Sequence, residues 1–216
     1  MDGVLGVLRA FYGPLVPPPR ALFAFFVWEV VSARTLPARR DLAWQALRRL
    51  PALTPDAMFR AATDDLETAL AAVGAVEQRI EALKSGSGHF RRHRDLAERV
   101  NGRLLGAARA LKRVPHLSPW ARSRALLWVG GHTLAPADDG LARVLRRLHG
   151  LPAGPKARVR RAARRHLMTA WHGQPERLCE AVVALGHHAA QACGEVPHCT
   201  VCPLASGCHH AQRGGR

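Results

Sequence analysis

The sequence predicts an all-α protein. Apolar residues recur every three or four positions through most of the chain, with arginines and other polar residues between them, as on amphipathic helices. The alternation of apolar and polar residues that is typical of β-strands is absent from the sequence. Of the 216 residues, 48% are hydrophobic, so we expect one large domain or two small ones.

The first half of the chain is expected to consist of short helices. Residues 21–33 are apolar enough for a buried helix, and residues 41–50 place arginines opposite an apolar face. A further helix starts at Thr54, because threonine caps a first turn and proline, here Pro55, fits the first helical position. We expect helices over 64–73, 76–84 and 95–111, and a flexible basic loop over 85–95.

The second half is predicted to be helical over 118–131, 140–151, 156–171 and 178–192. The turn VPHLSPW, residues 114–120, separates two of the expected helices. Ser118 is placed as an N-cap and Pro119 at the first helical position, so the first backbone N–H groups point outward. A hairpin of this form is able to hold one DNA phosphate, although most capped helices bind only water.

The net charge of +16 favours a polyanionic partner, either nucleic acid, an acidic membrane face or an acidic protein. Nearly all the cations are arginine, so compositional bias is an alternative explanation. The N-terminus lacks the basic region and cleavage site of a signal peptide, and no segment approaches the ~20 apolar residues that span a bilayer. We therefore expect a cytoplasmic, nucleoid-associated protein without a membrane partner.

The C-terminal cysteines have the spacing C-x5-C-x2-C-x5-C, which is compact enough for four thiolates to converge on one metal centre. Zinc and a [4Fe–4S] cluster both accept four cysteines, and the spacing leaves both open. Cys179 is expected to be a small buried residue. The predicted metal ligands are Cys193, Cys199, Cys202 and Cys208, and His198, His209 and His210 are further candidates for zinc.

These features together resemble the endonuclease III-like DNA glycosylases of the helix–hairpin–helix (HhH-GPD) superfamily. FVWEVVSART is similar to the family's first core helix and loop, and VPHLSPWARSRALL to the hairpin usually written LPGVGRKTA. APADDGLARV is similar to the segment with the valine–aspartate–threonine–histidine motif, and CTVCPLASGC to the cluster loop, nearest to that of the adenine glycosylases.

The resemblance implies a two-domain all-α fold with DNA in the cleft between the domains. Residues 21–133 would form a helical bundle that ends in the hairpin, and residues 1–20 would join residues 134–216 in a cluster domain. It also implies a [4Fe–4S] cluster rather than zinc, although the first cysteine spacer is one residue shorter than is usual. The implied partner is double-stranded DNA that contains damaged bases, bound by a monomer.

The resemblance also implies the chemistry. The match runs from the hairpin to the aspartate without a gap, which places Asp138, rather than Asp139, at the catalytic position. Lyase-competent members have a lysine where this chain has Trp120, so we expect a monofunctional glycosylase that uses water activated by Asp138. Asp138 also suits a plain helix cap. Trp120 is the residue of the 3-methyladenine glycosylases at this position, which makes alkylated purines an alternative substrate class.

The expected DNA contacts depart from the family pattern. Arg34 lies where a glutamine often fills the gap left by a flipped base, and Ala75, after Gly74, replaces a bulkier wedge residue. The hairpin's two glycines are replaced by residues with side chains. A DNA-binding paralogue with little or no activity is therefore an alternative, and a zinc-binding interaction module is another. The hairpin and phosphate contacts are predicted at Lys112, His116, Leu117 and Ser118.

Overall fold

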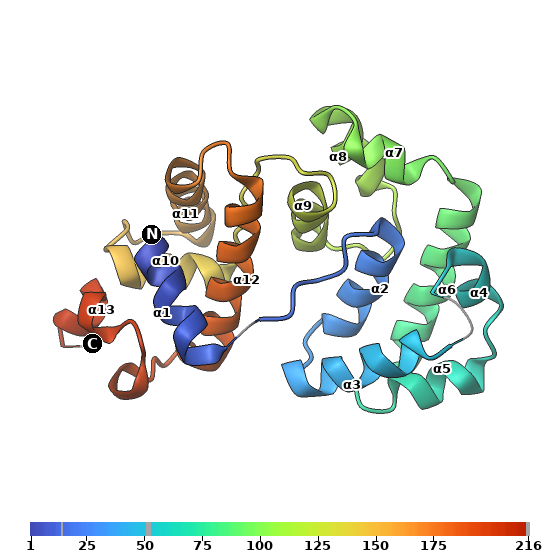
Figure 1. Cartoon of the computed structure of the whole chain (residues 1–216), viewed down its shortest axis with the longest axis horizontal. Helices are drawn as coiled ribbons and strands as arrows, with labels where there is room; N and C mark the ends of the chain where they lie inside the picture. The colour runs from blue at the N-terminus through green and yellow to red at the C-terminus, as the bar shows by residue number, and fades with distance from the viewer. Residues whose placement is uncertain (14, 51–52, 215–216) are drawn as a thin grey trace. The chain divides into compact units, whose positions relative to one another are not determined.

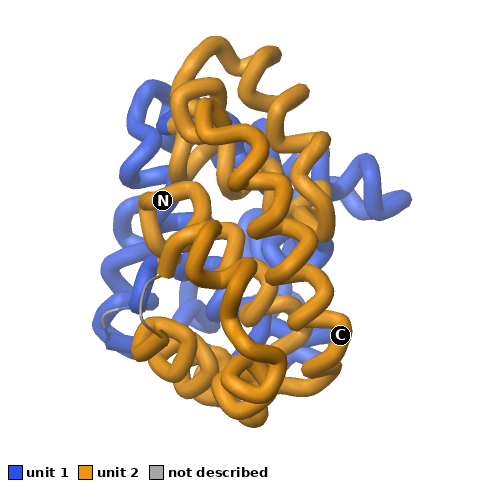
Figure 2. Tube along the Cα trace, turned by 90° about the vertical axis from the view of Figure 1, so that its right-hand side faces the viewer, with its two compact units in different colours: residues 1–17, 131–216 blue, residues 18–130 orange. Residues whose placement is uncertain are grey.

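The computed structural model describes residues 1–13, 15–50 and 53–214. Within them the chain is helical and forms no β-strand, which confirms the all-α prediction. The chain divides into two compact units (Figure 2): unit 1 comprises residues 1–17 and 131–216, and unit 2 comprises residues 18–130. The resemblance placed the domain boundaries at residues 21 and 133.

Unit 2 is built around α2 (Leu22–Ser32), the apolar helix expected over 21–33. Its side chains Phe25, Phe26 and Val27 are at most 1% exposed. It packs against α3, α6 and α9, while α4 packs against α6 and α8 against α9 (Figure 1). The other helices are α3 (Pro37–Arg48), α4 (Pro55–Arg60), α5 (Thr63–Leu70), α6 (Val76–Arg92), α7 (Leu96–Asn101), α8 (Leu104–Lys112) and α9 (Pro119–Trp128).

The loop predicted over 85–95 is wrong, because α6 continues through its SGSG segment to Arg92. Ser87 is fully buried, and a Cβ atom on Gly86 would overlap the ring of Phe26 from α2. The small residues therefore allow two helices to approach closely rather than breaking one of them. Tertiary packing here overrides the low helix propensity of glycine.

The single helix predicted over 95–111 is also wrong. The chain leaves the helical conformation at Gly102 and Arg103, whose backbones are extended, and this separates α7 from α8. The break allows each short helix to turn its own apolar residues inward, Leu96 and Val100 on one and Leu111 on the other. The helix starts predicted at Thr54 and Ser118 are confirmed.

Unit 1 joins the two ends of the chain. Helix α1 packs against α12, and α10 packs against α11, α12 and α13 (Figure 1). The sequence did not predict α1, which contains two glycines but buries Leu5 and Leu8. No helix among the described residues is long and apolar enough to cross a membrane. The helices are α1 (Asp2–Tyr12), α10 (Asp139–His149), α11 (Lys156–Ala170), α12 (Pro175–Gln191) and α13 (His209–Gln212).

Arg79 of α6 ties together the loop after α2 and the loop before α6. Its side chain is nearly buried at 8% exposed, and Nε donates to the carbonyl oxygen of Gly74 at 2.6 Å. The two terminal nitrogens donate to the end of α2 and the loop that follows it. Their acceptors are the carbonyl oxygens of Val30, Val31 at 3.1 Å and Ala33 at 2.7 Å, and Oγ1 of Thr35 at 2.9 Å.

We predict that Arg79→Lys destabilises the protein by about 2–4 kcal/mol, because one ammonium cannot reach these acceptors and leaves buried carbonyl groups unpaired. Urea unfolding followed by circular dichroism measures the change. Arg92→Lys, at an exposed position of the same helix, is the matched control and should change stability by less than about 0.5 kcal/mol. Equal stability of the two variants would contradict the assigned role.

Candidate active site and metal centre

Unit 2 contains a cavity of about 600 Å³. Its walls come from the end of α2, the start of α6 and the hairpin before α9. The cavity brings together six residues that the sequence analysis proposed for base or DNA binding, which lie up to 86 positions apart in the chain. They are Arg34, Gly74, Ala75, His116, Ser118 and Trp120.

Three of these residues have a strained backbone. Arg34, Ala75 and His116 have φ angles of 52°, 56° and 57°, and no other residue apart from glycine has a positive φ in the described ranges. The left-handed conformation costs a residue with a side chain roughly 1–2 kcal/mol. Strained backbone conformations are common at active sites and ligand-binding sites. Arg79 is bonded to the loops that carry Arg34 and Ala75.

Glu29 is a cavity residue that the sequence analysis did not single out. It lies on α2, its side chain is 10% exposed, and its Oε1 lies 2.9 Å from Nη1 of Arg124 on α9. Burial raises the pKa of Glu29, and the charge of Arg124 offsets only part of this rise. A carboxyl group with a raised pKa is suited to donate a proton. The guanidinium of Arg124 also lies 5.9 Å from the centre of the Trp120 ring.

The hairpin leads into α9 as the sequence indicated. Oγ of Ser118 accepts a hydrogen bond from the backbone N–H of Ala121 at 3.1 Å, with Pro119 at the first helical position. The Leu117 side chain is 3% exposed and belongs to the core, so only its backbone is available to a ligand. Lys112 is exposed but does not line the cavity.

Asp138 lies in unit 1, at the start of α10. Its Oδ1 accepts a hydrogen bond from the backbone N–H of Leu141 at 2.7 Å, so it caps this helix. An ionised carboxylate accepts several hydrogen bonds, so the cap is compatible with a further role. The neighbouring Asp139 is bound by Arg160 at 2.7 Å and by Lys156 at 3.4 Å. Burial raises the pKa of Asp139, but these two partners together lower it below its ordinary value.

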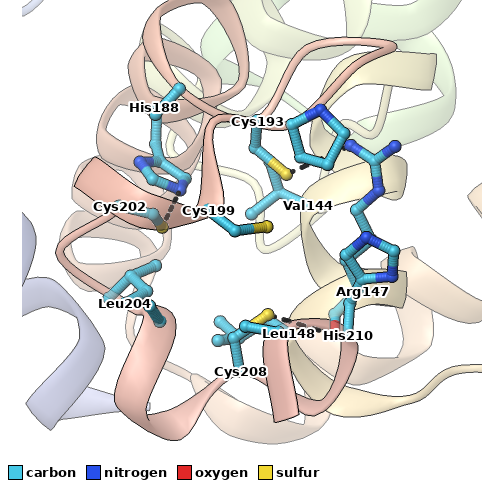
Figure 3. Close-up of a pocket in the computed structure, with 14 residues that line it drawn as sticks. Val144, Arg147, Leu148, His188, Cys193, Cys199, Cys202, Leu204, Cys208 and His210 are labelled. Atoms are coloured by element: carbon cyan, nitrogen blue, oxygen red, sulfur yellow. Dashed lines mark hydrogen bonds between the residues drawn. The ribbon is translucent and has the colours of Figure 1, made fainter. Parts of the chain in front are cut away.

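The four C-terminal cysteines line one cavity in unit 1 (Figure 3). Cys193 follows α12, and the other three lie in the irregular segment up to α13. Among the described residues, no three His, Cys, Asp or Glu side chains are grouped closely enough to hold one ion. Figure 3 shows the side chains of the four cysteines around this cavity. Apolar residues complete the wall: Val144, Leu148, Ala192, Pro197, Leu204, Ala205 and Ala211.

Hydrogen-bonding groups that the sequence did not indicate also reach the thiols. Nε2 of the buried His188 lies 3.6 Å from Sγ of Cys202, and its Nδ1 lies 2.9 Å from the hydroxyl of Tyr12. Nη1 of Arg147 lies 3.5 Å from Sγ of Cys193. Burial raises the pKa of Cys202, a backbone hydrogen bond from Leu204 lowers it, and the other three thiols raise it further. A metal centre would relieve this mutual repulsion, because metal ions bind thiolates.

The histidines named as further zinc ligands are divided between two environments. His210 lines the cysteine cavity, and its buried Nε2 has no hydrogen-bond partner among the described residues. His198 and His209 do not line this cavity. Cys179, as predicted, is buried within α12 at 2% exposed.

Comparison with known proteins identifies the fold. No protein-family model and no curated protein matches the sequence. Among solved structures, an endonuclease III–DNA covalent intermediate matches with a TM-score of 0.68 and 16% identity, over 100% of this chain and 97% of the other. A non-covalent endonuclease III–DNA complex matches with a TM-score of 0.69 and 16% identity, over 100% of this chain and 96% of the other. A thermostable thymine-DNA glycosylase matches with a TM-score of 0.65 and 17% identity, over 98% of this chain and 96% of the other. The chain therefore has the all-α fold that endonuclease III shares with thymine-DNA glycosylase.

Proposed function

We propose that this protein is a DNA glycosylase of base excision repair that hydrolyses the N-glycosidic bond of a damaged base. The observation that carries the proposal is the cavity of unit 2, where Trp120, Arg34 and the hairpin meet around the buried carboxyl group of Glu29. The full-length fold similarity to proteins named as endonuclease III and thymine-DNA glycosylase supports the same class.

The cavity suits a flipped base. Its volume of about 600 Å³ falls in the range of small-molecule sites, which is roughly 300–1,000 Å³. A base must leave the duplex before its glycosidic bond is accessible, and an aromatic face such as that of Trp120 holds it by stacking. The N-terminus of α9 lies at the same cavity, and the positive end of its helix dipole favours a phosphate there.

Glu29 favours a neutral base over a cationic one. A neutral base is a poor leaving group until a ring nitrogen is protonated, and Glu29 is the acid that would supply this proton. An alkylated, cationic purine leaves without that proton, and the guanidinium of Arg124 beside Trp120 would repel it. The alkylpurine alternative is therefore the weaker of the two.

Asp138 is proposed as the carboxylate that stabilises the oxocarbenium-like sugar and orients the attacking water. Since the resemblance aligns Trp120 with the lysine of the lyase-competent glycosylases, we propose a monofunctional enzyme. The second candidate is a DNA-binding paralogue without activity. It is favoured by the cap that Asp138 forms, which accounts for this residue without catalysis.

We propose a [4Fe–4S] cluster as the group held by Cys193, Cys199, Cys202 and Cys208. The four cysteines line one cavity whose walls are otherwise mostly apolar, and four cysteine thiolates are the ligand set of this cluster. Bound there, the cluster would link the segment after α12 to α13 and so stabilise this part of unit 1. His188 and Arg147 would donate hydrogen bonds to its sulfur ligands.

Replacement of Asp138 tests the catalytic assignment. We expect Asp138→Asn to lower single-turnover excision by about 100-fold or more while DNA affinity is kept, because it removes a charge used in the transition state. Asparagine caps helices as well as aspartate does, so the fold is preserved. Asp139→Asn is the matched control and should retain activity. Strand breaks should appear only after alkali, and efficient borohydride trapping of the unmutated protein would overturn the monofunctional proposal.

The proton donor is tested by pH. Because the active form of Glu29 is protonated, excision of a neutral base should fall as the pH rises through the raised pKa of this residue. Glu29→Gln should lower the rate and remove this alkaline limb, whereas the exposed Glu77→Gln should leave the profile unchanged. The measurement is the single-turnover rate across a pH series. A Glu29→Gln profile with the same alkaline limb would show that another group titrates.

The metal centre is tested by composition. The protein should be brown and contain roughly four iron atoms per chain if the four thiolates bind one cubane. Cys202→Ser should lose the iron and destabilise unit 1, whereas Cys179→Ser should retain it. Iron and zinc analysis together with the visible spectrum measures the result, and a colourless protein with one zinc ion would contradict the cluster.

A further inference from the structure

Helix α11 carries an arc of four arginines that is separate from the cavity of unit 2. At the pitch of an α-helix these positions fall within about 120° of its circumference. All four are exposed, and the opposite side of the helix buries Ala163 and Leu167. We call this group the α11 arginine arc; its members are Arg158, Arg161, Arg164 and Arg165.

Acidic residues of unit 1 do not neutralise this arc. No arginine of the arc forms an ion pair among the described residues. Asp138 caps α10, and Glu176 lies in the first turn of α12. The other acidic side chains of the unit pair with bases outside the arc: Asp2 with Arg177, Asp139 with Lys156 and Arg160, Glu180 with Arg9 and Arg177, and Glu195 with Arg143.

The arc also opposes the stability of its own helix. Arg161 and Arg165 are four residues apart, as are Arg160 and Arg164, and like charges at this spacing repel each other. The first turn of α11 has no acidic residue and begins with Lys156, although the positive end of the helix dipole favours acidic side chains there. Lys156 and Arg160 are compensated by their ion pairs with Asp139. The charges of the arc itself have no ion pair among the described residues, which is typical of a binding surface.

We propose that the α11 arginine arc binds the phosphate backbone of DNA, as a second contact surface in addition to the hairpin and cavity of unit 2. The inference rests on the proposed function only in taking DNA as the partner. The planar guanidinium group matches phosphate oxygens in pairs. From Arg158 to Arg165 the helix rises roughly 10 Å, which is about three nucleotide steps along one strand.

The surface favours nucleic acid over a membrane. Helices that lie on membranes combine basic residues with exposed large apolar side chains that enter the lipid. None of the exposed large hydrophobic residues of the described chain lies on α11. The arc also offers no aromatic face on which a base would stack, so the expected contacts are with the backbone and do not depend on DNA sequence.

The test is the affinity of the iron-replete protein for a short undamaged duplex between about 50 and 200 mM salt. The variant replaces all four residues of the arc by glutamine. The matched control makes the same charge change at four exposed arginines of unit 2 outside the cavity, Arg39, Arg48, Arg49 and Arg94. Circular dichroism melting in the absence of DNA confirms that both variants fold, and the arc variant should melt at a higher temperature than the unmutated protein.

We expect the affinity of the arc variant to fall on the order of tenfold or more, and its slope of log affinity against log salt to become shallower by about 0.9 for each phosphate that it no longer neutralises. The control should change this slope by less than about 0.9. Equal slopes for the two variants would overturn the inference, as would loss of binding to anionic lipid vesicles with duplex binding unchanged. Excision by the unmutated protein is measured separately. Absence of excision would count against the glycosylase proposal, whereas unchanged duplex affinity of the arc variant would count against DNA binding by the arc.

Discussion

The cavity of unit 2 depends on one buried cation. Arg79 gives its guanidinium N–H groups to acceptors at the end of α2 and in two loops. Burial of an unpaired charge would cost far more than these bonds return, so the loops must close around it. They carry Arg34 and Ala75, whose left-handed backbones would otherwise relax. Burial lowers the pKa of Arg79 without removing its role as a fixed donor.

The two units differ in what holds their candidate sites in place. In unit 2, the apolar α2 supplies a rigid wall, and its one acidic residue, Glu29, is kept at the cavity by Arg124. In unit 1, the segment from Cys193 to Cys208 contains only two short 3₁₀ turns, and the side chains of Val196 and Val201 are exposed. A metal centre held by the four cysteines would cross-link this segment and so stabilise it.

Periodicity predicted the helices whose apolar faces follow the 3.6-residue repeat, and capping chemistry predicted the starts of α4 and α9. It failed over residues 85–95 because Gly86 and Ser87 are typical of loops, whereas both are buried in α6 and Gly86 packs against the ring of Phe26. It also missed Arg79 and Glu29. Arg79 and Glu29 each lie within a helix, and the neighbouring residues in the sequence do not indicate their burial or their partners on other elements.

The sequence by itself determined the all-α fold, the four-cysteine spacing and the hairpin with its capping serine, because each follows from interactions between residues that are close in the chain. Tertiary structure decided that Glu29 and Arg124 share one cavity with the residues that resemblance had proposed, that Glu29 has a raised pKa, and that His188 and Arg147 reach the cysteines. These properties arise from burial and from contacts between distant segments. Periodicity records which face of a helix is buried but not which partner covers it.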